Sequence, residues 1–385
     1  MIVPAASAAR AVGPFRPHRR PGGLHVHFGA GKLGLGLVIP AISESDGDFV
    51  VVQRDTGPWR QLAESGRRVG LFINSERVLT LGTATRFGPG ALGGILLTDA
   101  REHWLEASRR ATSFSCSLGP SCADALLPVL SGLPRRPPDE RPVLYACENS
   151  AESVRALEGG LSGRVAVTQC MVDRICYDKR VEPALGRIDV MAEEHPGSIV
   201  IYDPEEDPPM DGDMVTVTDD ALVAEYMFSE KKCLVNGVHT ALAFLTLLEH
   251  EAARGRREPC AGLPIDPRTC RDARLLSWCE ASVDYLLHEH GAGLASRSHG
   301  AGAGEVRGIL MGKATESLER FSSVSDTTSR VLSRGYTQAF EDRMLPVLNF
   351  AAGGGYIARP GVRDHLRGLE TGCRSLCRRQ RGGSC

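Results

Sequence analysis

The 385-residue sequence lacks the features that mark several large classes of protein. It has no run of about 18 apolar residues, which a membrane-spanning helix requires. Its body has no basic tract, and a net charge of -2 argues against broad nucleic-acid binding. The twelve cysteines form no CxxC pairs near histidines, so they predict no metal site, and their scatter is typical of reduced intracellular thiols. The sequence predicts a cytoplasmic globular protein with a small-molecule ligand.

Acidic residues are absent from the N-terminal part of the chain before Glu44. The first 22 residues carry four arginines together with several alanines and prolines. An arginine-bearing start without acids resembles an organelle transit peptide, whereas its proline content is equally typical of a disordered extension. Residues 1–22 are therefore expected to be a targeting segment or a disordered extension, and neither contributes to the fold.

A glycine-rich turn follows the first predicted strand. Residues 24–28 predict a short buried strand, and residues 33–42 an apolar helix that Pro40 kinks or ends. In such a unit the glycines let the backbone approach a pyrophosphate, which the helix N-terminus faces. The unit predicts dinucleotide binding, and its candidate cofactor-binding residues are Gly29, Ala30, Gly31, Lys32, Leu33 and Gly34.

The acidic residue that dinucleotide-binding proteins carry about 20 residues further on is displaced here. The second predicted strand, residues 49–52, is followed by Gln53, Arg54 and Asp55. Asp55 is suited to the ribose 2′-hydroxyl of NAD, whereas Arg54 is suited to the 2′-phosphate of NADP. All three residues are candidate cofactor-binding residues, and they leave the choice between NAD and NADP open.

Further strands and helices alternate along the first half of the chain. Strands are predicted at residues 112–116, 143–147 and 165–169, helices at 102–109 and 123–130, and loops at 133–142 and 203–213. This alternation predicts a parallel sheet that helices cover on both faces. From Asp220 onward long helical patterns dominate, with interruptions predicted at residues 251–267 and 291–304. The predicted fold is α/β: a Rossmann-type doubly wound sheet in residues 23–220 and a mainly α-helical substrate or catalytic domain in 221–385.

Lysine is scarce, with five lysines among 45 basic residues, so Lys231 in the pattern Lys231-x4-Asn236-x2-His239 stands out. At about 100° per residue, the three side chains fall within an arc of roughly 140° on one helix. An amine acts as a general base near neutral pH when a dry or positively charged setting lowers its pKa. The apolar run that follows and the adjacent Lys232 provide both. The pattern predicts lysine-based alcohol oxidation; a solvated charge pair beside a half-buried histidine is the alternative.

Several stretches between about residues 24 and 346 together resemble the polyol-specific long-chain dehydrogenase family. They occur in the family's order, and their combination is more specific than any one of them. The stretches are HFGAGKLGLG at 27–36, SLGP at 117–120, ACEN at 146–149, VDRI at 172–175, the Lys231, Asn236 and His239 triplet, and a late segment with Arg320-Phe321, Asp326, Arg330-Val331, Arg334 and Asp342-Arg343.

The resemblance implies an NAD- or NADP-dependent enzyme that interconverts mannitol 1-phosphate and fructose 6-phosphate without a metal. Lys231 would be the general base in polyol oxidation and the general acid in ketose reduction. Asn149 and Asn236 would donate hydrogen bonds to the reacting oxygen, where negative charge develops. Gly119 and Asn149 would also contact the cofactor.

The resemblance further implies residues that bind the substrate. Asp173 and His239 would hold polyol hydroxyl groups. Arg330 and Arg334 would face the end of a polyol phosphate or ketose phosphate, because a guanidinium fork suits a phosphate.

The sequence also departs from the family pattern at several places. Lys32-Leu33 replaces the more usual Asn-Ile, Gly237-Val238 replaces Thr-Gly before His239, and the loop at 335–339 has no lysine or arginine. These changes leave cofactor preference and phosphate selectivity open. The alternatives are a dehydrogenase of an unphosphorylated polyol or a hexuronate, and a nucleotide-binding protein without catalytic activity.

Overall fold

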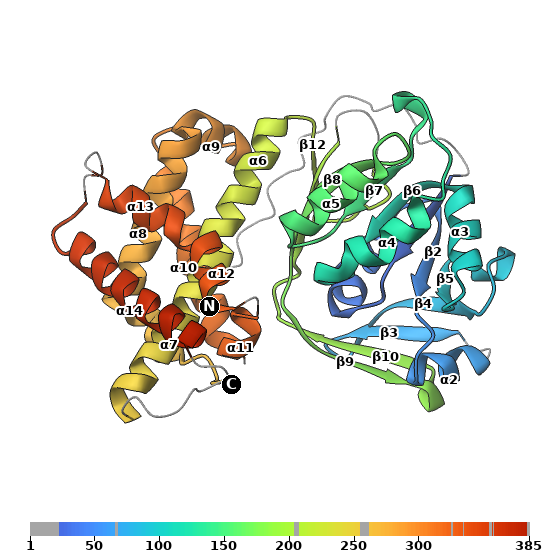
Figure 1. Ribbon diagram of the computed structural model, residues 1–385, viewed down its shortest axis with the longest axis horizontal. Coiled ribbons are helices and arrows are strands. Elements are labelled where there is room, and N and C mark those ends of the chain that lie inside the picture. The colour runs from blue at the N-terminus through green and yellow to red at the C-terminus, as the bar shows by residue number, and fades with distance from the viewer. Residues whose placement is uncertain are drawn as a thin grey trace, which may run out of the picture.

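The computed structural model describes residues 23–65, 68–203, 208–254, 262–324, 326–333, 335–353, 356 and 358–382. The N-terminal segment 1–22 and Arg334 therefore lie outside the described residues. Figure 1 shows two lobes, one built around a sheet and one built from helices, and the chain passes from the first to the second once. Among the described residues, no helix is both long and apolar enough to cross a membrane, and ten cysteines are present as free thiols.

Twelve strands of the described chain form one sheet in the order β12-β11-β8-β7-β6-β1-β2-β5-β4-β3-β10-β9. Their bounds are β1 (Leu24–Phe28), β2 (Asp48–Gln53), β3 (Val69–Ile73), β4 (Glu76–Ala84), β5 (Gly94–Leu97), β6 (Ala111–Cys116), β7 (Val143–Ala146), β8 (Ala166–Asp173), β9 (Cys176–Glu182), β10 (Arg187–Ala192), β11 (Ser198–Tyr202) and β12 (Val215–Thr218). Neighbours from β8 to β4 run parallel. The chain order reverses at β1, between β6 and β2, and ligands of such sheets bind at the strands' carboxyl ends there.

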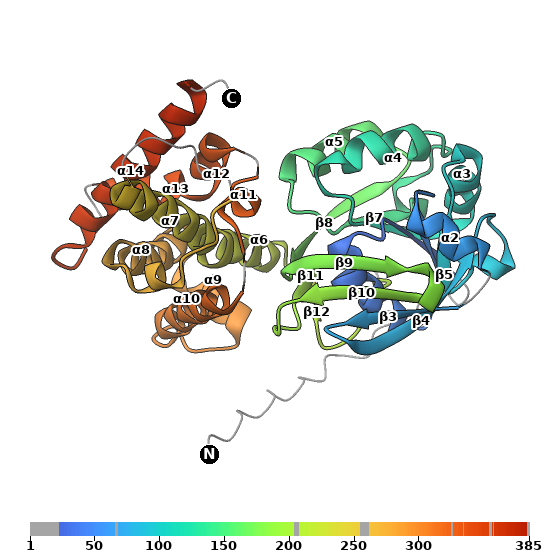
Figure 2. The same cartoon turned by 90° about the horizontal axis from the view of Figure 1, so that it is seen from below.

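Helices cover both faces of this sheet, as the alternation of strands and helices predicts. They are the π-helical segment η1 (Gly34–Val38), α1 (Ile39–Ser43), α2 (Pro58–Glu64), α3 (Arg101–Arg110), α4 (Cys122–Leu130) and α5 (Ala151–Leu161). Figure 2 shows α3, α4 and α5 together on one face. All five residues of β1 are buried, with Phe28 in a core shared with Trp104 of α3 and Leu126 of α4. Burial on both faces is typical of a central parallel strand.

The helical lobe begins with one continuous helix that contains a π-helical turn. Its parts are α6 (Ala221–Glu230), η6 (Lys231–Gly237) and α7 (Val238–Arg254). The other helices are α8 (Ala273–His290), α9 (Ala292–His299), α10 (Val306–Ser323), α11 (Thr328–Val331), α12 (Tyr336–Arg343), α13 (Leu345–Ala352) and α14 (Val362–Gly382). The apolar run of α7, including Leu242 and Phe244, is fully buried against Trp278 of α8 in the core of this lobe. Helix α7 is thus the central helix of the lobe.

The predicted fold class is confirmed: a Rossmann-type sheet is followed by a mainly helical region. The helical pattern is interrupted within the predicted stretch 291–304, at Gly291 and from Gly300 onward, where φ angles of 78° and 59° cap α8 and α9. The helix α9 between these two glycines was not predicted. Pro40 does not end its helix, which continues through η1 and α1, and it lies where the π-helical segment passes into α1. The antiparallel pairs β3/β4, β9/β10 and β8/β11 were not predicted.

Candidate functional site

The glycine turn after β1 has the geometry that a dinucleotide phosphate requires. Gly29 has a φ of 109°, and a Cβ there would lie 2.8 Å from the carbonyl oxygen of Ser117. A Cβ at Gly34 would lie 2.5 Å from the carbonyl oxygen of Gly29. Only glycine fits both positions, and the helix that continues through η1 and α1 begins directly at the turn. These features fit a pyrophosphate, whose charge favours exposed backbone N–H groups at a helix N-terminus.

A buried histidine, His27, forms a hydrogen bond to the glycine turn. His27 Nε2 lies 2.9 Å from the carbonyl oxygen of Gly29, and because a carbonyl only accepts, Nε2 carries the proton. Nδ1 then accepts from the Ser115 hydroxyl at 2.7 Å. Burial lowers the pKa of His27 to about 4, against an opposing contribution from the Gly29 hydrogen bond, so the imidazole is neutral at pH 7. Sequence reasoning missed this role, although the polar residues inside two apolar strands were a signal for it.

The loop after β6 is held by a carboxyl group that sequence reasoning assigned to no site. Glu148, two residues after β7, accepts hydrogen bonds from the backbone N–H groups of Leu118 at 2.5 Å and Gly119 at 3.0 Å. Gly119 has a φ of 71°, which favours glycine. Burial raises the pKa of Glu148 to about 8, although the two backbone N–H groups lower it. Glu148 thereby fixes the loop against the glycine turn.

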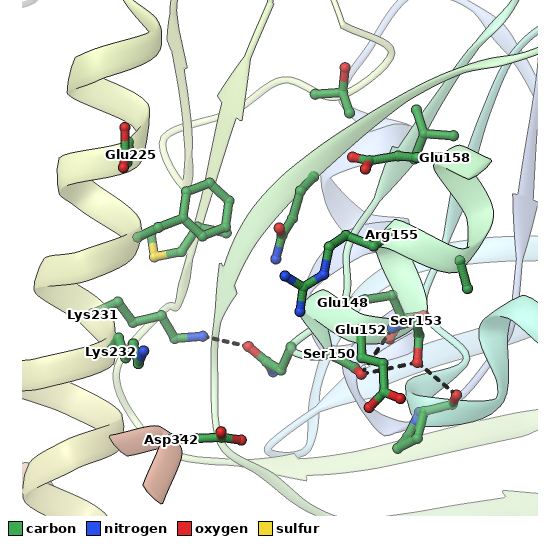
Figure 3. Close-up of a pocket in the computed structure, with 18 of the residues that line it drawn as sticks. Glu148, Ser150, Glu152, Ser153, Arg155, Glu158, Glu225, Lys231, Lys232 and Asp342 are labelled. Carbon is green, nitrogen blue, oxygen red and sulfur yellow. Dashed lines mark hydrogen bonds between the residues drawn. The ribbon is translucent and has the colours of Figure 1, made fainter. Parts of the chain in front are cut away.

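A cavity of about 1410 Å³ lies between the two lobes. The sheet lobe contributes residues of α5 and β8 to its wall, and the helical lobe contributes residues of α6, η6 and α12 (Figure 3). Lys231, Asn149 and Asn236 all line this cavity. The structure therefore brings together the three residues that the sequence predicts as catalytic.

Lys231 lies at the centre of the junction. Its Nζ donates to Asn149 Oδ1 at 2.7 Å and to the carbonyl oxygen of Val172. These bonds use two of the three N–H groups of an ammonium. In Figure 3 the Lys231 side chain extends from its helix toward the sheet lobe, on the side where Ser150 lies.

The electrostatic setting of Lys231 suits proton transfer. Lys231 is only 7% exposed. Burial lowers the pKa of Lys231 to about 8; Asp173 raises it, and Arg343 and Arg320 lower it further. The sequence suggested Lys232 as the neighbouring charge, but Lys232 is exposed. The charges that shift the pKa of Lys231 are instead those of Asp173, Arg343 and Arg320. An amine with a pKa of about 8 exchanges a proton readily near neutral pH.

The π-helical conformation of η6 places two of these residues in the cavity wall. Hydrogen bonding from i to i+5 widens the turn, so Lys231 and Asn236, five positions apart, reach the same cavity. The Thr240 hydroxyl donates to the Asn236 carbonyl at 2.7 Å. At Gly237 a Cβ would lie 3.1 Å from the Trp278 ring, so the glycine lets this turn pack against α8. Single π turns occur frequently at functional sites.

His239 and Arg330, predicted to bind substrate, share one carboxylate partner away from the described cavity wall. His239 Nε2 lies 3.0 Å from Asp326 Oδ2, and its ring stacks on Phe321 at 3.9 Å. Arg330 donates to both oxygens of Asp326. Burial lowers the pKa of His239, against the opposing effect of Asp326, while His239 and Arg330 hold the pKa of Asp326 below its usual value despite burial. Neither His239 nor Arg330 lines the cavity.

Asp173 forms part of a buried ion pair that joins the lobes. Arg320 of α10 donates to Asp173 at 2.7 Å and to Glu193, after β10, at 2.5 Å. Burial opposes ionisation of Asp173, but Lys231 and Arg320 outweigh it and hold its pKa below the usual value. Asp173 is therefore placed to act on Lys231 by its charge, and it is not among the residues that line the cavity.

The charged side chains that do line the cavity were mostly not singled out by the sequence. Arg155 and Glu158 come from α5, Glu225 from α6 and Asp342 from α12, and Figure 3 shows them around the same space. Arg343 also lines the cavity, and both Asp342 and Arg343 belong to the late family segment quoted from the sequence. The only sequence signal for the α5 residues was the polar side of a helix that sequence reasoning did not predict. Within the part of the chain that the structure describes, no cluster of His, Cys, Asp or Glu could hold a metal.

The sequence matches no family model and no curated protein sequence. Its structure resembles that of substrate-free D-sorbitol dehydrogenase, with 15% identity, 92% of each chain covered and a TM-score of 0.52. Weaker similarities are found to octopine dehydrogenase in complex with NADH and agmatine, at 11% identity over 92% of this chain and 89% of that chain with a TM-score of 0.49, and to 2-dehydropantoate 2-reductase from Porphyromonas gingivalis, at 13% identity over 81% and 94% with a TM-score of 0.44. The first similarity shows that this chain has the Rossmann-type fold of that dehydrogenase.

Proposed function

We propose that this protein is an NAD(P)-dependent dehydrogenase that interconverts mannitol 1-phosphate and fructose 6-phosphate, as a mannitol-1-phosphate 5-dehydrogenase does. The observation that carries the proposal is the buried Lys231 amine, with a pKa of about 8, bound to Asn149 in a cavity between the lobes. The glycine turn and the sequence resemblance support it. In this proposal residues 23–220 bind the cofactor, and residues 221–385 supply the base.

The nicotinamide cofactor, when bound, supplies or accepts the hydride. In polyol oxidation the neutral Nζ of Lys231 takes the proton of the substrate hydroxyl group, and in ketose reduction the protonated Nζ returns a proton to the carbonyl oxygen. The bonds to Asn149 and Val172 hold Nζ in place. The position of the amine is thus fixed before substrate arrives, which reduces the entropic cost of reaching the reactive geometry.

The two amides of the site serve the reacting oxygen. Asn149 and Asn236 line the same cavity as Lys231 and come from opposite lobes. An amide N–H that points at an oxygen on which negative charge develops lowers the energy of the transition state. In this proposal both amides act together with Lys231 on the reacting oxygen atom.

A terminal phosphate requires cationic side chains in the cavity wall. Arg330 is held by Asp326, and Arg334 lies outside the described residues. Arg155, Lys232 and Arg343 line the cavity and are the groups that we assign to the phosphate. An arginine binds phosphate oxygens in bidentate fashion, whereas a lysine contributes a point charge.

A second candidate function is oxidation of an unphosphorylated polyol. The cavity wall also carries the carboxylates of Glu152, Glu158, Glu225 and Asp342. Carboxylates accept hydrogen bonds from hydroxyl groups and repel a phosphate, so this part of the wall favours an uncharged sugar alcohol.

The test is an absorbance assay of cofactor oxidation with fructose 6-phosphate and with fructose, each with NADH and NADPH. Turnover with fructose 6-phosphate and little with fructose supports the proposed function. Preference for fructose would favour the second candidate. No turnover of any substrate, despite measurable nucleotide binding, would indicate a nucleotide-binding protein without this activity.

A further inference from the structure

A second cavity, of about 410 Å³, lies where β2 and β5 end. Its wall includes Arg54 after β2, Asp99 and Arg101 between β5 and the first turn of α3, and Asp124 of α4. In a dinucleotide-binding sheet with this strand order, the residues that end the second strand face the 2′ position of the adenosine ribose. This cavity is therefore the place for the adenosine half of the cofactor assumed in the proposed function.

We propose that Arg54 binds a 2′-phosphate in this cavity, so that the protein prefers NADP(H) to NAD(H). Of the three residues that follow or end β2, only Arg54 lines the cavity. The Gln53 side chain instead accepts from the Ala30 backbone N–H at 2.9 Å, which ties it to the glycine turn. Arg54 is therefore the residue after β2 that offers a cation to the adenosine ribose.

Asp55 is not placed to accept a ribose hydroxyl. Its Oδ2 lies 3.1 Å from Arg60 Nε. Its Oδ1 is buried without a hydrogen-bond partner, so a ligand in the cavity cannot reach it without a rearrangement of the chain. Asp55 also does not line the cavity. The carboxylate that would select NAD at the end of the second strand is thus paired with Arg60 and is not part of the cavity wall.

The remaining charges of the cavity wall come from other elements. Arg101 adds a second guanidinium, which also donates to the carbonyl oxygen of Pro128. Asp99 and Asp124 add two carboxylates from the β5–α3 connection and from α4. Asp99 is the competing acceptor for a 2′-hydroxyl, so the experiment has to separate its effect from that of Arg54.

Calorimetric titration of the full-length protein with adenosine 2′,5′-bisphosphate and with adenosine 5′-monophosphate tests the proposal without a substrate. A charge-assisted hydrogen bond to the 2′-phosphate should make the bisphosphate bind about tenfold to a hundredfold more tightly. Arg54→Gln should abolish that difference and leave affinity for the monophosphate unchanged. Arg54→Lys should retain part of it. Arg109→Gln, an exposed arginine at the other end of α3, is the matched control and should retain all of it.

Equal affinity for the two nucleotides, or equal losses for both in Arg54→Gln, would overturn the proposal. So would tighter binding of NADH than of NADPH, with Asp99→Asn removing that preference. The last result would leave the proposed dehydrogenase function standing, because NADH would still bind. Failure of the protein to bind any of these nucleotides would overturn both the proposed function and this inference.

Discussion

Lys231 is buried and yet bound to two fixed acceptors, Asn149 and Val172, so its position does not depend on solvent. Replacing it by alanine should lower turnover by about a hundredfold or more, which is the usual contribution of general acid–base catalysis. Steady-state kinetics would measure this loss, and fluorescence titration should show nucleotide binding unchanged. Lys231→Arg should be equally impaired, because a guanidinium retains the charge and does not deprotonate in proteins. Substantial activity in either variant would remove Lys231 from the mechanism.

The lowered pKa of Lys231 predicts opposite pH dependences for the two directions of the reaction. Above a pH of about 8 the amine is mostly neutral, and below it the amine is mostly charged. Polyol oxidation, which needs the neutral base, should therefore rise as pH increases through 8, and ketose reduction should fall. Profiles of kcat/KM in both directions would measure this. Glu148 also has a pKa of about 8 and lines the cavity, so Glu148→Gln is the control: its profiles should retain the same midpoint.

At the level of the elements, the glycine turn depends on one backbone conformation. Gly29→Ala would combine a positive φ, which costs about 1 to 3 kcal/mol in a residue other than glycine, with a Cβ 2.8 Å from the Ser117 carbonyl oxygen. We expect lower thermal stability and weak nucleotide binding. Gly300→Ala shares the positive φ, with no atom within 4 Å of its Cβ, and caps α9. It should lose stability alone, and loss of nucleotide binding in both variants would contradict the assignment of the turn.

Local sequence signals predicted the elements that have a strong periodicity. The turn at Gly29 and the π-helical segment with Lys231 and Asn236 are both readable as motifs, because each depends on residues close together in the chain. The π-helical conformation of that segment was not predicted, because residue spacing does not signal i to i+5 hydrogen bonding or the close approach of Gly237 to Trp278. The roles of His239 and Arg330 remain predictions. The contact of His239 with Asp326 depends on tertiary structure that no spacing encodes, whereas Asp326 and Arg330 are only four residues apart in the chain.

The cavity joins the two lobes, and each lobe offers a guanidinium to it: Arg155 from α5 and Arg343 from α12. If these bind the substrate phosphate, Arg155→Gln and Arg343→Gln should each raise KM for fructose 6-phosphate about tenfold or more. For Arg155→Gln, activity toward fructose should change little, because the sugar alone does not need this arginine. Arg343→Gln should in addition shift the pH dependence with fructose, because Arg343 lowers the pKa of Lys231. Arg330→Ala, outside the cavity wall, is the comparison and should have the smaller effect on KM. Equal losses on both substrates would indicate a general defect and argue against a phosphate site.

Buried ion pairs of Arg320 also join the two lobes. Arg320 of the helical lobe is 10% exposed at its side chain, and both of its partners, Asp173 and Glu193, belong to the sheet lobe. Arg320→Leu would leave two buried carboxylates without their cation, and removal of one partner of a buried ion pair typically costs about 3 to 5 kcal/mol. Urea denaturation should show a loss of this size.

Arg307→Leu provides the matched control for this last prediction. Arg307 pairs with Asp284 within the helical lobe, its side chain is 42% exposed, and such a pair contributes about 0 to 1 kcal/mol. The Arg320 variant should also change the pH profile of any remaining activity, because Arg320 lowers the pKa of Lys231 while the Asp173 that it binds raises it. A loss of stability no greater than that of the control would show that the lobes do not depend on this ion pair.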